Sequence, residues 1–135
     1  MELEKIARNY MSIWNYNNQE KLDDFADKNL VVDYSHFPHP IIGINNYKNT
    51  LEETYSYFPD IAIELKEIII AENEKKVTVL WKYKGTHKKG EIFGIKASNK
   101  KVEVNGITIL NIENNKVKLE KGIVDNMSLL EQVKG

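Results

Sequence analysis

The sequence predicts a single α+β domain in which helices pack on one face of an antiparallel sheet. Helical patterns dominate the chain as far as Pro59, whereas β-rich segments fill most of the chain from Ile61 onward. Helices followed by consecutive strands are typical of this class, because helices and strands alternate in proteins built on a parallel sheet. The 135 residues, 41% of them hydrophobic, match one domain with its own core. We therefore predict one domain over residues 1–135.

Three amphipathic segments make up the helical part. Apolar residues of the first segment recur at three- and four-residue steps, which places them on one helix face. They are Leu3, Ile6, Ala7, Tyr10, Ile13 and Trp14. After the interruption NYNNQE, Asn18 is predicted to cap a short second helix that carries Leu22 and Phe25. The third helix is predicted to end at Pro59, because the residue before a proline is pushed out of the α region. Its apolar face consists of Ile44, Tyr47, Leu51, Tyr55 and Phe58.

The remaining segments are predicted to be strands, loops and one last helix. NLVVDY is a short β-like run, and SHFPHPIIG is predicted to be a loop because it holds two prolines and a glycine. The later β-rich runs show partial period-two alternation. They are IAIELKEIII, KVTVLWKYKG, KVEVNGITILNI and KVKLEKGIV. ENEKK and ENNK are predicted hairpin turns, and SLLEQV closes the chain as a helical turn or two.

A curved sheet with helices across its concave face encloses a pocket, and apolar pockets of this kind are the usual ligand sites. Some strands are apolar on both faces: Ile107 and Ile109 point one way, and Thr108, Leu110 and Ile112 the other. One face serves the pocket and a small apolar ligand. The other face needs a second layer, so we expect a homodimer through the outer face of the sheet.

Composition excludes several functional classes. The net charge is −1, from 19 basic and 20 acidic side chains, whereas nucleic-acid or membrane-surface partners favour a positive excess. The absence of cysteine excludes thiolate catalysis and cysteine-ligated zinc. The N-terminus MELEKIARNY is unlike a signal peptide, and the longest aliphatic run, IIIA, is too short to span a bilayer. We expect a cytoplasmic protein with no nucleic-acid or membrane partner.

Five features of the sequence together are similar to one family. These are FPD at 58–60, GTH at 85–87, FGI at 93–95, NGITIL at 105–110, and Asp125 followed by LLEQV. Their order and spacing resemble the SnoaL-like polyketide cyclases, also called ester cyclases, of the nuclear transport factor 2-like superfamily. The resemblance implies a cone-shaped α+β barrel, usually a dimer or larger oligomer, with a deep apolar pocket. It also implies a cofactor-free intramolecular aldol closure in which an aspartate at the end of the last long strand is the general acid/base. By position, that aspartate is Asp125.

Two roles are possible for Asp125, and they are compatible with each other. Asp is a preferred helix N-cap, and the segment MSLLEQV that follows it is helical in pattern. In a partly desolvated pocket the same carboxylate would serve as a base. The sequence departs from the family at Leu119 and Lys121, where an acidic residue and a tryptophan are usual. Strand alternation puts Leu119, Lys121, Ile123 and Asp125 on one face, and a lysine near Asp125 would weaken it as a base or pair it structurally.

The other candidate site residues are histidines and aromatics. His87 is either a polar residue at a hairpin end or a rim histidine that assists Asp125. His36 and His39 have a spacing that suits a metal, but without a clear third ligand we expect no metal site and interpret their loop as a pocket cover lined by His36. Several aromatics are core residues by default and candidates for the pocket wall. They are Trp14, Tyr34, Tyr55, Trp81 and Phe93, and Lys121 is added to this ligand-binding set.

The sequence thus favours a cofactor-free cyclase or isomerase acting on a small apolar carbonyl compound, with Asp125 as acid/base and His87 assisting. A non-catalytic small-molecule-binding protein on the same fold is the alternative, with Asp125 acting only as a cap. An isomerase or dehydratase is a third possibility, because one fold hosts several reactions.

Overall fold

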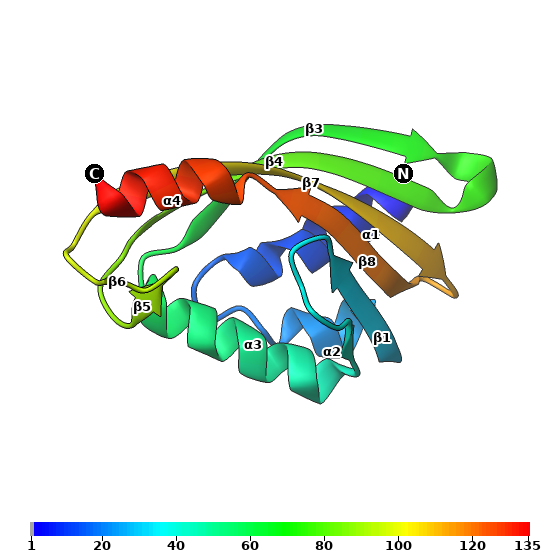
Figure 1. Ribbon diagram of the computed structural model, residues 1–135. Helices are drawn as coiled ribbons and strands as arrows, with labels where there is room; N and C mark the ends of the chain where they lie inside the picture. Colours follow the sequence, from blue (N-terminus) through cyan, green and yellow to red (C-terminus); the bar gives the residue numbers. More distant parts are fainter. Residues whose placement is uncertain (1) are drawn as a thin grey trace.

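The computed structural model describes residues 2–135, and Figure 1 shows its helices and strands in chain order. The first part contains α1 (Glu2–Met11), the 3-10 turn η1 (Ser12–Trp14), α2 (Lys21–Phe25), β1 (Ala26–Tyr34), β2 (Ile41–Ile42) and α3 (Ile44–Tyr57). The second part contains β3 (Ala62–Ala71), the 3-10 turn η2 (Glu72–Glu74), β4 (Lys76–Thr86), β5 (Glu91–Ile92), β6 (Ile95–Lys96), β7 (Lys101–Glu113), β8 (Lys116–Val124) and α4 (Asn126–Lys134). The predicted order of helices followed by strands is confirmed.

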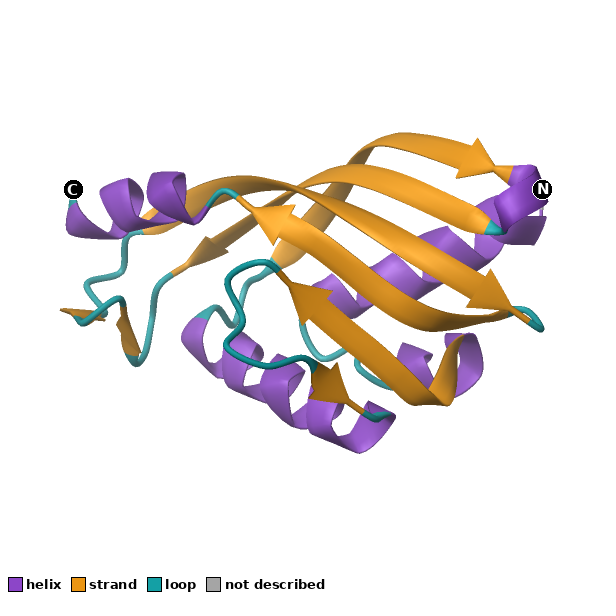
Figure 2. Ribbon diagram, turned by 45° about the vertical axis from the view of Figure 1, so that its right-hand side comes forward, coloured by secondary structure: helices purple, strands orange, loops and turns teal. Residues whose placement is uncertain are grey.

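Six strands form one sheet in the order β2-β1-β8-β7-β4-β3. The sheet is long and curved, and α1, α2 and α3 lie against its concave side (Figure 2). The predicted α+β class and cone-like barrel are therefore confirmed. One pair departs from the antiparallel pattern, since β1 runs parallel to β8. A parallel pair requires a long crossover, and the chain between Tyr34 and Lys116 supplies it.

The ends of the helices follow the predictions except at one position. The predicted cap by Asn18 is wrong: α2 begins after Glu20 without a side-chain cap. The Asn18 side-chain amide instead donates to the Ser12 carbonyl at 3.0 Å and closes the turn after α1. The third helix ends at Tyr57, just before the Phe58–Pro59 bond, as predicted.

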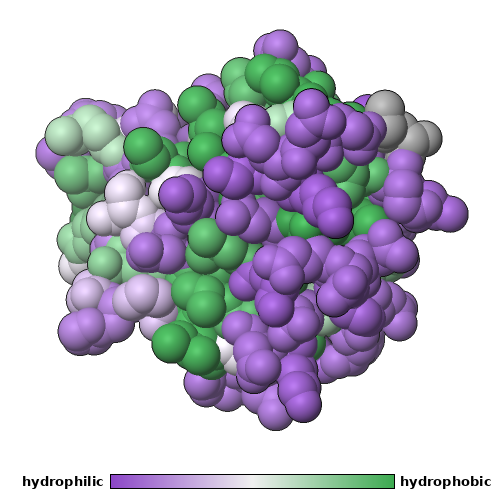
Figure 3. Space-filling view, turned by 90° about the vertical axis from the view of Figure 1, so that its right-hand side faces the viewer, coloured by the Kyte–Doolittle hydropathy of each residue, from purple (hydrophilic) through white to green (hydrophobic). Residues whose placement is uncertain are grey.

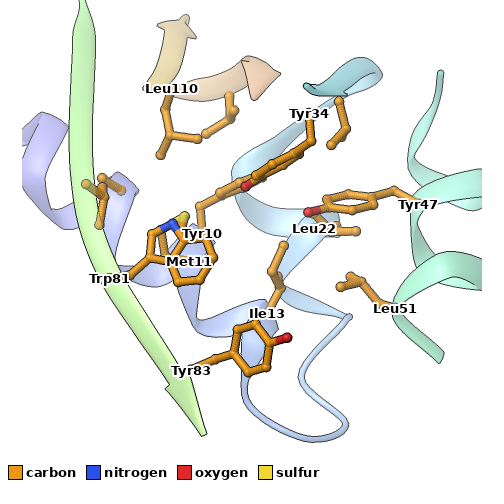
Figure 4. Packing of buried hydrophobic residues seen from close by; sticks show 14 of the residues in the cluster. Tyr10, Met11, Ile13, Leu22, Tyr34, Tyr47, Leu51, Trp81, Tyr83 and Leu110 are labelled. Atoms are coloured by element: carbon orange, nitrogen blue, oxygen red, sulfur yellow. The ribbon is translucent and has the colours of Figure 1, made fainter. Parts of the chain in front are cut away.

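The core lies between α1, α3 and the concave face of the sheet. Figure 4 shows Tyr10, Met11 and Ile13 from the N-terminal segment packed toward Trp81 and Tyr83 of β4. Burying a large apolar side chain contributes about 1.5–3 kcal/mol, so this cluster holds the helices on the sheet. The helices thereby close the concave side except where a pocket remains.

The convex face of the sheet exposes apolar side chains. Ile107 is 47% exposed, Ile123 63% and Met127 71%, and all three line one groove on this face. Another side of the molecule, seen in Figure 3, also has hydrophobic side chains reaching a largely hydrophilic surface. Among residues 2–135, no helix is both long enough and apolar enough to cross a membrane.

Candidate functional site

An interior pocket of about 260 Å³ lies between α3 and the concave face of the sheet. The turn after α1 contributes Trp14, and β4 contributes Trp81 and Tyr83. Helix α3 adds Thr50 and Thr54. The other lining residues are Tyr34, His36, Phe37, Tyr57, Phe58, Ile61, Ile92, Phe93, Val124, Asn126 and Leu129. None of these lining residues is Asp, Glu, Lys or Arg, so the pocket is apolar and aromatic.

Five of the predicted ligand-binding residues line this pocket: Trp14, Tyr34, His36, Trp81 and Phe93. Their elements are far apart in the sequence, and the fold brings them together.

Two other predicted ligand-binding residues do not line the interior pocket. The Tyr55 hydroxyl donates to the carbonyl of Ile13 and ties α3 to the turn after α1. Burial raises the pKa of Tyr55 to about 12, so the hydroxyl remains a donor. Lys121 is exposed on the convex face, beside Ile109 and Ile123.

Asp125 follows β8 and caps α4, because its carboxylate accepts a hydrogen bond from the Ser128 backbone N–H at 3.1 Å. The capping role is therefore confirmed. The side chain is exposed and lines a groove of about 750 Å³ on the convex face rather than the interior pocket. The groove and the pocket share His36, Trp81, Val124 and Asn126. We call these four shared residues the junction, and Asp125 lies in the chain between two of them.

Strand alternation accounts for the position of Asp125. Lys121 and Ile123 share one face of β8, as predicted, and that face is the convex one. Alternation tells which residues share a face, but it does not tell which face the helices cover. Among residues 2–135, no ion pair joins Lys121 to Asp125, and the Asp125 carboxylate makes its capping bond to Ser128.

Glu120, on the opposite face of β8, is fully buried and was not singled out from the sequence. The hydroxyls of Tyr10 and Tyr47 donate to one carboxylate oxygen at 2.6 Å and 2.9 Å. Tyr34 donates to the other oxygen. Burial raises the pKa of Glu120 above its usual value, and the three hydroxyls oppose this rise because they stabilise the charged form. The missed signal was the pair Tyr10 and Tyr47 on apolar helix faces, since a buried tyrosine hydroxyl needs a partner.

The hydrogen bonds of Glu120 extend to the pocket wall. Thr108 Oγ1 lies 2.7 Å from the Tyr34 hydroxyl and accepts from Trp81 Nε1 at 2.9 Å. Because Tyr34 donates to Glu120, the Thr108 hydroxyl donates to Tyr34, and the bonds run in one direction from Trp81 to Glu120. Figure 4 shows Tyr34 and Trp81 among the packed aromatics of this region. The buried carboxylate thus holds two rings that line the pocket.

His87 is completely buried behind the pocket wall and does not line it. Its ring packs 5.9 Å from that of Phe58, which does line the pocket. Nε2 lies 2.9 Å from the Gly90 carbonyl and must carry a proton, because a carbonyl only accepts. The His87 backbone N–H also donates to the Lys100 backbone carbonyl at 2.8 Å. His87 therefore anchors the segment that carries β5 and β6.

His36 belongs to the exposed loop after β1 and lines both the pocket and the convex groove. Its ring contacts the ring of Phe37 at 4.8 Å between centroids. Partial burial lowers the pKa of His36, which favours the neutral imidazole near pH 7. No cluster of three or more His, Cys, Asp or Glu that could hold a metal occurs in residues 2–135.

Solved structures with the same architecture include TsrD from Streptomyces laurentii, with a TM-score of 0.84, 19% identity, and coverage of 98% of this chain and 94% of that one. IdmH from Streptomyces antibioticus matches with a TM-score of 0.78, 16% identity, and coverage of 96% and 99%. A SnoaL-like protein from Jannaschia sp. CCS1 matches with a TM-score of 0.82, 12% identity, and coverage of 98% and 93%. At these identities the likeness shows the fold.

A search of curated proteins gives no match. The sequence itself matches the profile of the SnoaL-like polyketide cyclases over residues 4–133. This match covers nearly the whole chain, from within α1 to within α4, and includes both the pocket and the junction. The protein therefore belongs to the SnoaL-like polyketide cyclase family.

Proposed function

We propose that the protein is a cofactor-independent acid–base enzyme of the cyclase or isomerase type, acting on a small apolar carbonyl compound held in the interior pocket. The observation that carries this proposal is the junction, where an aromatic pocket adjoins the His36 imidazole and the Asp125 carboxylate. A ligand in the pocket would present one end to these two groups. Fold and family by themselves leave the reaction open, so the proposal rests on this site.

The proposed reaction starts at a carbon flanked by two carbonyls. Asp125 takes a proton from this carbon, and the enolate carbon attacks a third carbonyl carbon, further along the same molecule. A carbon–carbon bond forms, the attacked carbonyl becomes an alkoxide, and the alkoxide recovers the proton from Asp125. The neutral His36 ring donates a hydrogen bond to the enolate oxygen. The pocket contributes by folding the substrate so that its two reacting ends meet.

His87 has a supporting role in this proposal. It keeps Ile92 and Phe93 against the pocket through its bonds to Gly90 and Lys100. Because His87 lies behind the pocket wall, it positions the wall and does not touch the substrate.

The test is the ring closure of a set of 1,3-diketones that carry a third ketone further along the chain, such as 3-acetylnonane-2,8-dione. Closure is followed by the loss of absorbance of the 1,3-diketone enol, because the carbon between the two carbonyls has no proton left in the aldol product. Asp125→Asn should lower kcat/KM by at least about 100-fold, because a general base contributes about 10²–10⁴. Asn caps a helix as well as Asp does, so this variant should keep the wild-type stability. Undiminished turnover by Asp125→Asn would refute the role of Asp125.

The second candidate is a non-catalytic binding protein. Its specific support is the capping bond of Asp125 together with the absence of any carboxylate among the described residues that line the interior pocket. In this case no diketone closes faster than in buffer, although ligands still enter the pocket. Filling the pocket would then abolish binding, and Asp125→Asn would leave it unchanged.

We also propose that two copies pair through the convex face of the sheet. The apolar side chains of Ile107, Ile123 and Met127 on this face support the proposal, since a homodimer would remove them from water. Light scattering should give twice the chain mass, and Ile107→Lys should give a monomer. Ile42→Lys, on the edge strand β2, is the matched control because Ile42 is also exposed. A wild-type monomer at all concentrations would refute the pairing.

A further inference from the structure

We infer that the interior pocket selects an uncharged, flat molecule of one or two rings that offers a hydrogen-bond acceptor to Trp14. This inference rests on the proposed function only in taking the pocket as the ligand site. Four features of the pocket lead to it: the charge, shape and size of the space, and one unpartnered donor in its wall.

The charge of the ligand follows from the pocket lining. No Asp, Glu, Lys or Arg occurs among the described residues that line the pocket. Its titratable groups are the neutral His36 and tyrosines, such as Tyr34 and Tyr83, whose pKa values burial raises. A charged group would lose its hydration here without gaining a counter-charge. The pocket therefore disfavours both carboxylates and ammonium groups.

The shape of the ligand follows from the rings on the wall. Trp81 and Tyr83 lie stacked on β4, with ring centroids 6.0 Å apart and an interplanar angle of 27°. The bond from Trp81 to Thr108 fixes the indole, so this surface keeps its orientation. Trp14 and Tyr57 add aromatic surface from other parts of the chain. A planar conjugated ligand can stack against these aromatic rings, whereas a puckered saturated ring cannot.

The size of the ligand follows from the volume. The space of about 260 Å³ falls below the range of about 300–1,000 Å³ that is typical for drug-sized ligands. One or two fused rings are the appropriate size for it. A third fused ring would require the wall to open, including the segment that His87 anchors.

The polar contact follows from Trp14. Its Nε1–H is buried and has no hydrogen-bond partner among residues 2–135. Trp14 lines the pocket, and an indole N–H only donates. A buried donor without a partner is destabilising, so a ligand acceptor that reaches it would gain affinity. A carbonyl oxygen on the ring system is the acceptor that suits the proposed chemistry.

The experiment uses the wild-type protein and a series built on chromone, a flat neutral two-ring ketone. Calorimetry gives the affinities. Tryptophan fluorescence reports the location, because the only two tryptophans of the chain, Trp14 and Trp81, both line the pocket. Chromone should bind and change the fluorescence. Chromone-2-carboxylate should bind at least about ten-fold more weakly because its charge is not compensated.

Other members of the series test shape, size and the acceptor. The saturated ketone 2-decalone and the three-ring xanthone should both bind more weakly than chromone. Naphthalene, which has no acceptor, should also bind more weakly than chromone. Trp14→Phe should weaken the binding of chromone and leave the binding of naphthalene unchanged. Equal binding of chromone and its carboxylate, or no binding of chromone, would overturn the inference.

Three variants of α3 test the location of the site and the role of charge. Thr54→Phe fills the pocket and should abolish chromone binding, whereas Glu53→Phe adds the same ring to an exposed position of α3 and should not. Thr54→Lys supplies the missing counter-charge and should reverse the preference toward chromone-2-carboxylate. An unchanged preference in folded Thr54→Lys protein would also contradict the inference.

The outcome is separable from that of the proposed function. The chromone series is measured on the wild-type protein, and none of the four features that lead to the inference involves Asp125, which lies outside the interior pocket. If the chromone preference holds while no diketone turns over, only the catalytic proposal fails. If turnover is found only with charged substrates, the proposed function stands and the ligand inference fails.

Discussion

Glu120 lies within β8 and Asp125 directly follows that strand, yet the two carboxylates lie in opposite environments. Glu120 faces the core and accepts three tyrosine hydroxyls, from α1, β1 and α3. Asp125 faces water and accepts one backbone N–H at the start of α4. Burial, and not residue type, decides what each can do. The buried carboxyl organises the pocket wall, and the exposed one caps α4 beside the junction.

The largest expected effect on the free energy of unfolding comes from removing Glu120, the buried carboxylate. Glu120→Ala leaves three buried hydroxyls without an acceptor and opens a cavity, so it should lower the free energy of unfolding by about 3–5 kcal/mol. Urea denaturation measures this loss. Glu64→Ala, on the exposed face of β3, is the control and should change stability by less than about 0.5 kcal/mol. A loss as small as the control's would mean that the tyrosine hydroxyls find other partners.

The pH dependence of stability should also distinguish the two carboxylates. The pKa of Glu120 is raised in the folded protein, so between the unfolded value of about 4.3 and the folded pKa the folded state binds more protons. The contribution of Glu120 to the free energy of unfolding is therefore largest below the unfolded pKa, and it is lost as pH rises through the folded pKa. The slope of one group is at most about 1.4 kcal/mol per pH unit.

The measurement is the difference between wild type and Glu120→Gln in urea unfolding across this pH range. Taking the difference cancels Asp60 and Glu103, whose pKa values are lowered and whose contributions have the opposite sign. Wild type should lose stability relative to Glu120→Gln as the pH rises. A parallel pair of curves would show that Glu120 has the same proton affinity in both states.

The exposed member of the pair should have a smaller effect on stability. Asp125→Ala removes the cap of α4 and should cost about 1 kcal/mol, whereas Asp125→Asn should stay within a few tenths because Asn also caps. Thermal unfolding of the two variants gives both values. Equal losses in the two would imply that the charge of Asp125, and not its capping bond, stabilises α4.

The smallest effect on stability is expected for Lys121, on the convex face. Among the described residues Lys121 forms no ion pair with Asp125, so Lys121→Met should change stability by less than about 0.5 kcal/mol. It should also leave kcat/KM for any diketone unchanged. A change in kcat/KM without a change in stability would place Lys121 near the substrate.

Much of the fold was predictable because it depends on local patterns. The spacing of Leu3, Ile6 and Tyr10 predicted the buried face of α1, and the Phe58–Pro59 bond predicted the end of α3. The wrong prediction for Asn18 has a local cause as well: its amide found an acceptor in the preceding turn, at Ser12. Local alternatives of this kind compete with capping, and the sequence does not rank them.

The candidate site was predictable in part. Four aromatics that line the pocket were named from the sequence as ligand-binding candidates: Trp14, Tyr34, Trp81 and Phe93. Phe37, Tyr57, Phe58 and Tyr83 also line it and were not named as such, and Tyr55 was named but does not line it. Glu120 was missed because a glutamate in a strand is normally exposed. Its burial depends on Tyr10, which lies 110 residues earlier in the chain.

The sequence by itself determined the order of helices and strands, the family, the cap at Asp125 and the residues that share a face of β8. Only the tertiary structure decided which face of β8 is inside, and with it the separate roles of Glu120 and Asp125. The physical reason is that alternation along a strand is a local property of the backbone. The covering of one face is set by helices that are distant in sequence and pack where the most apolar surface can be buried.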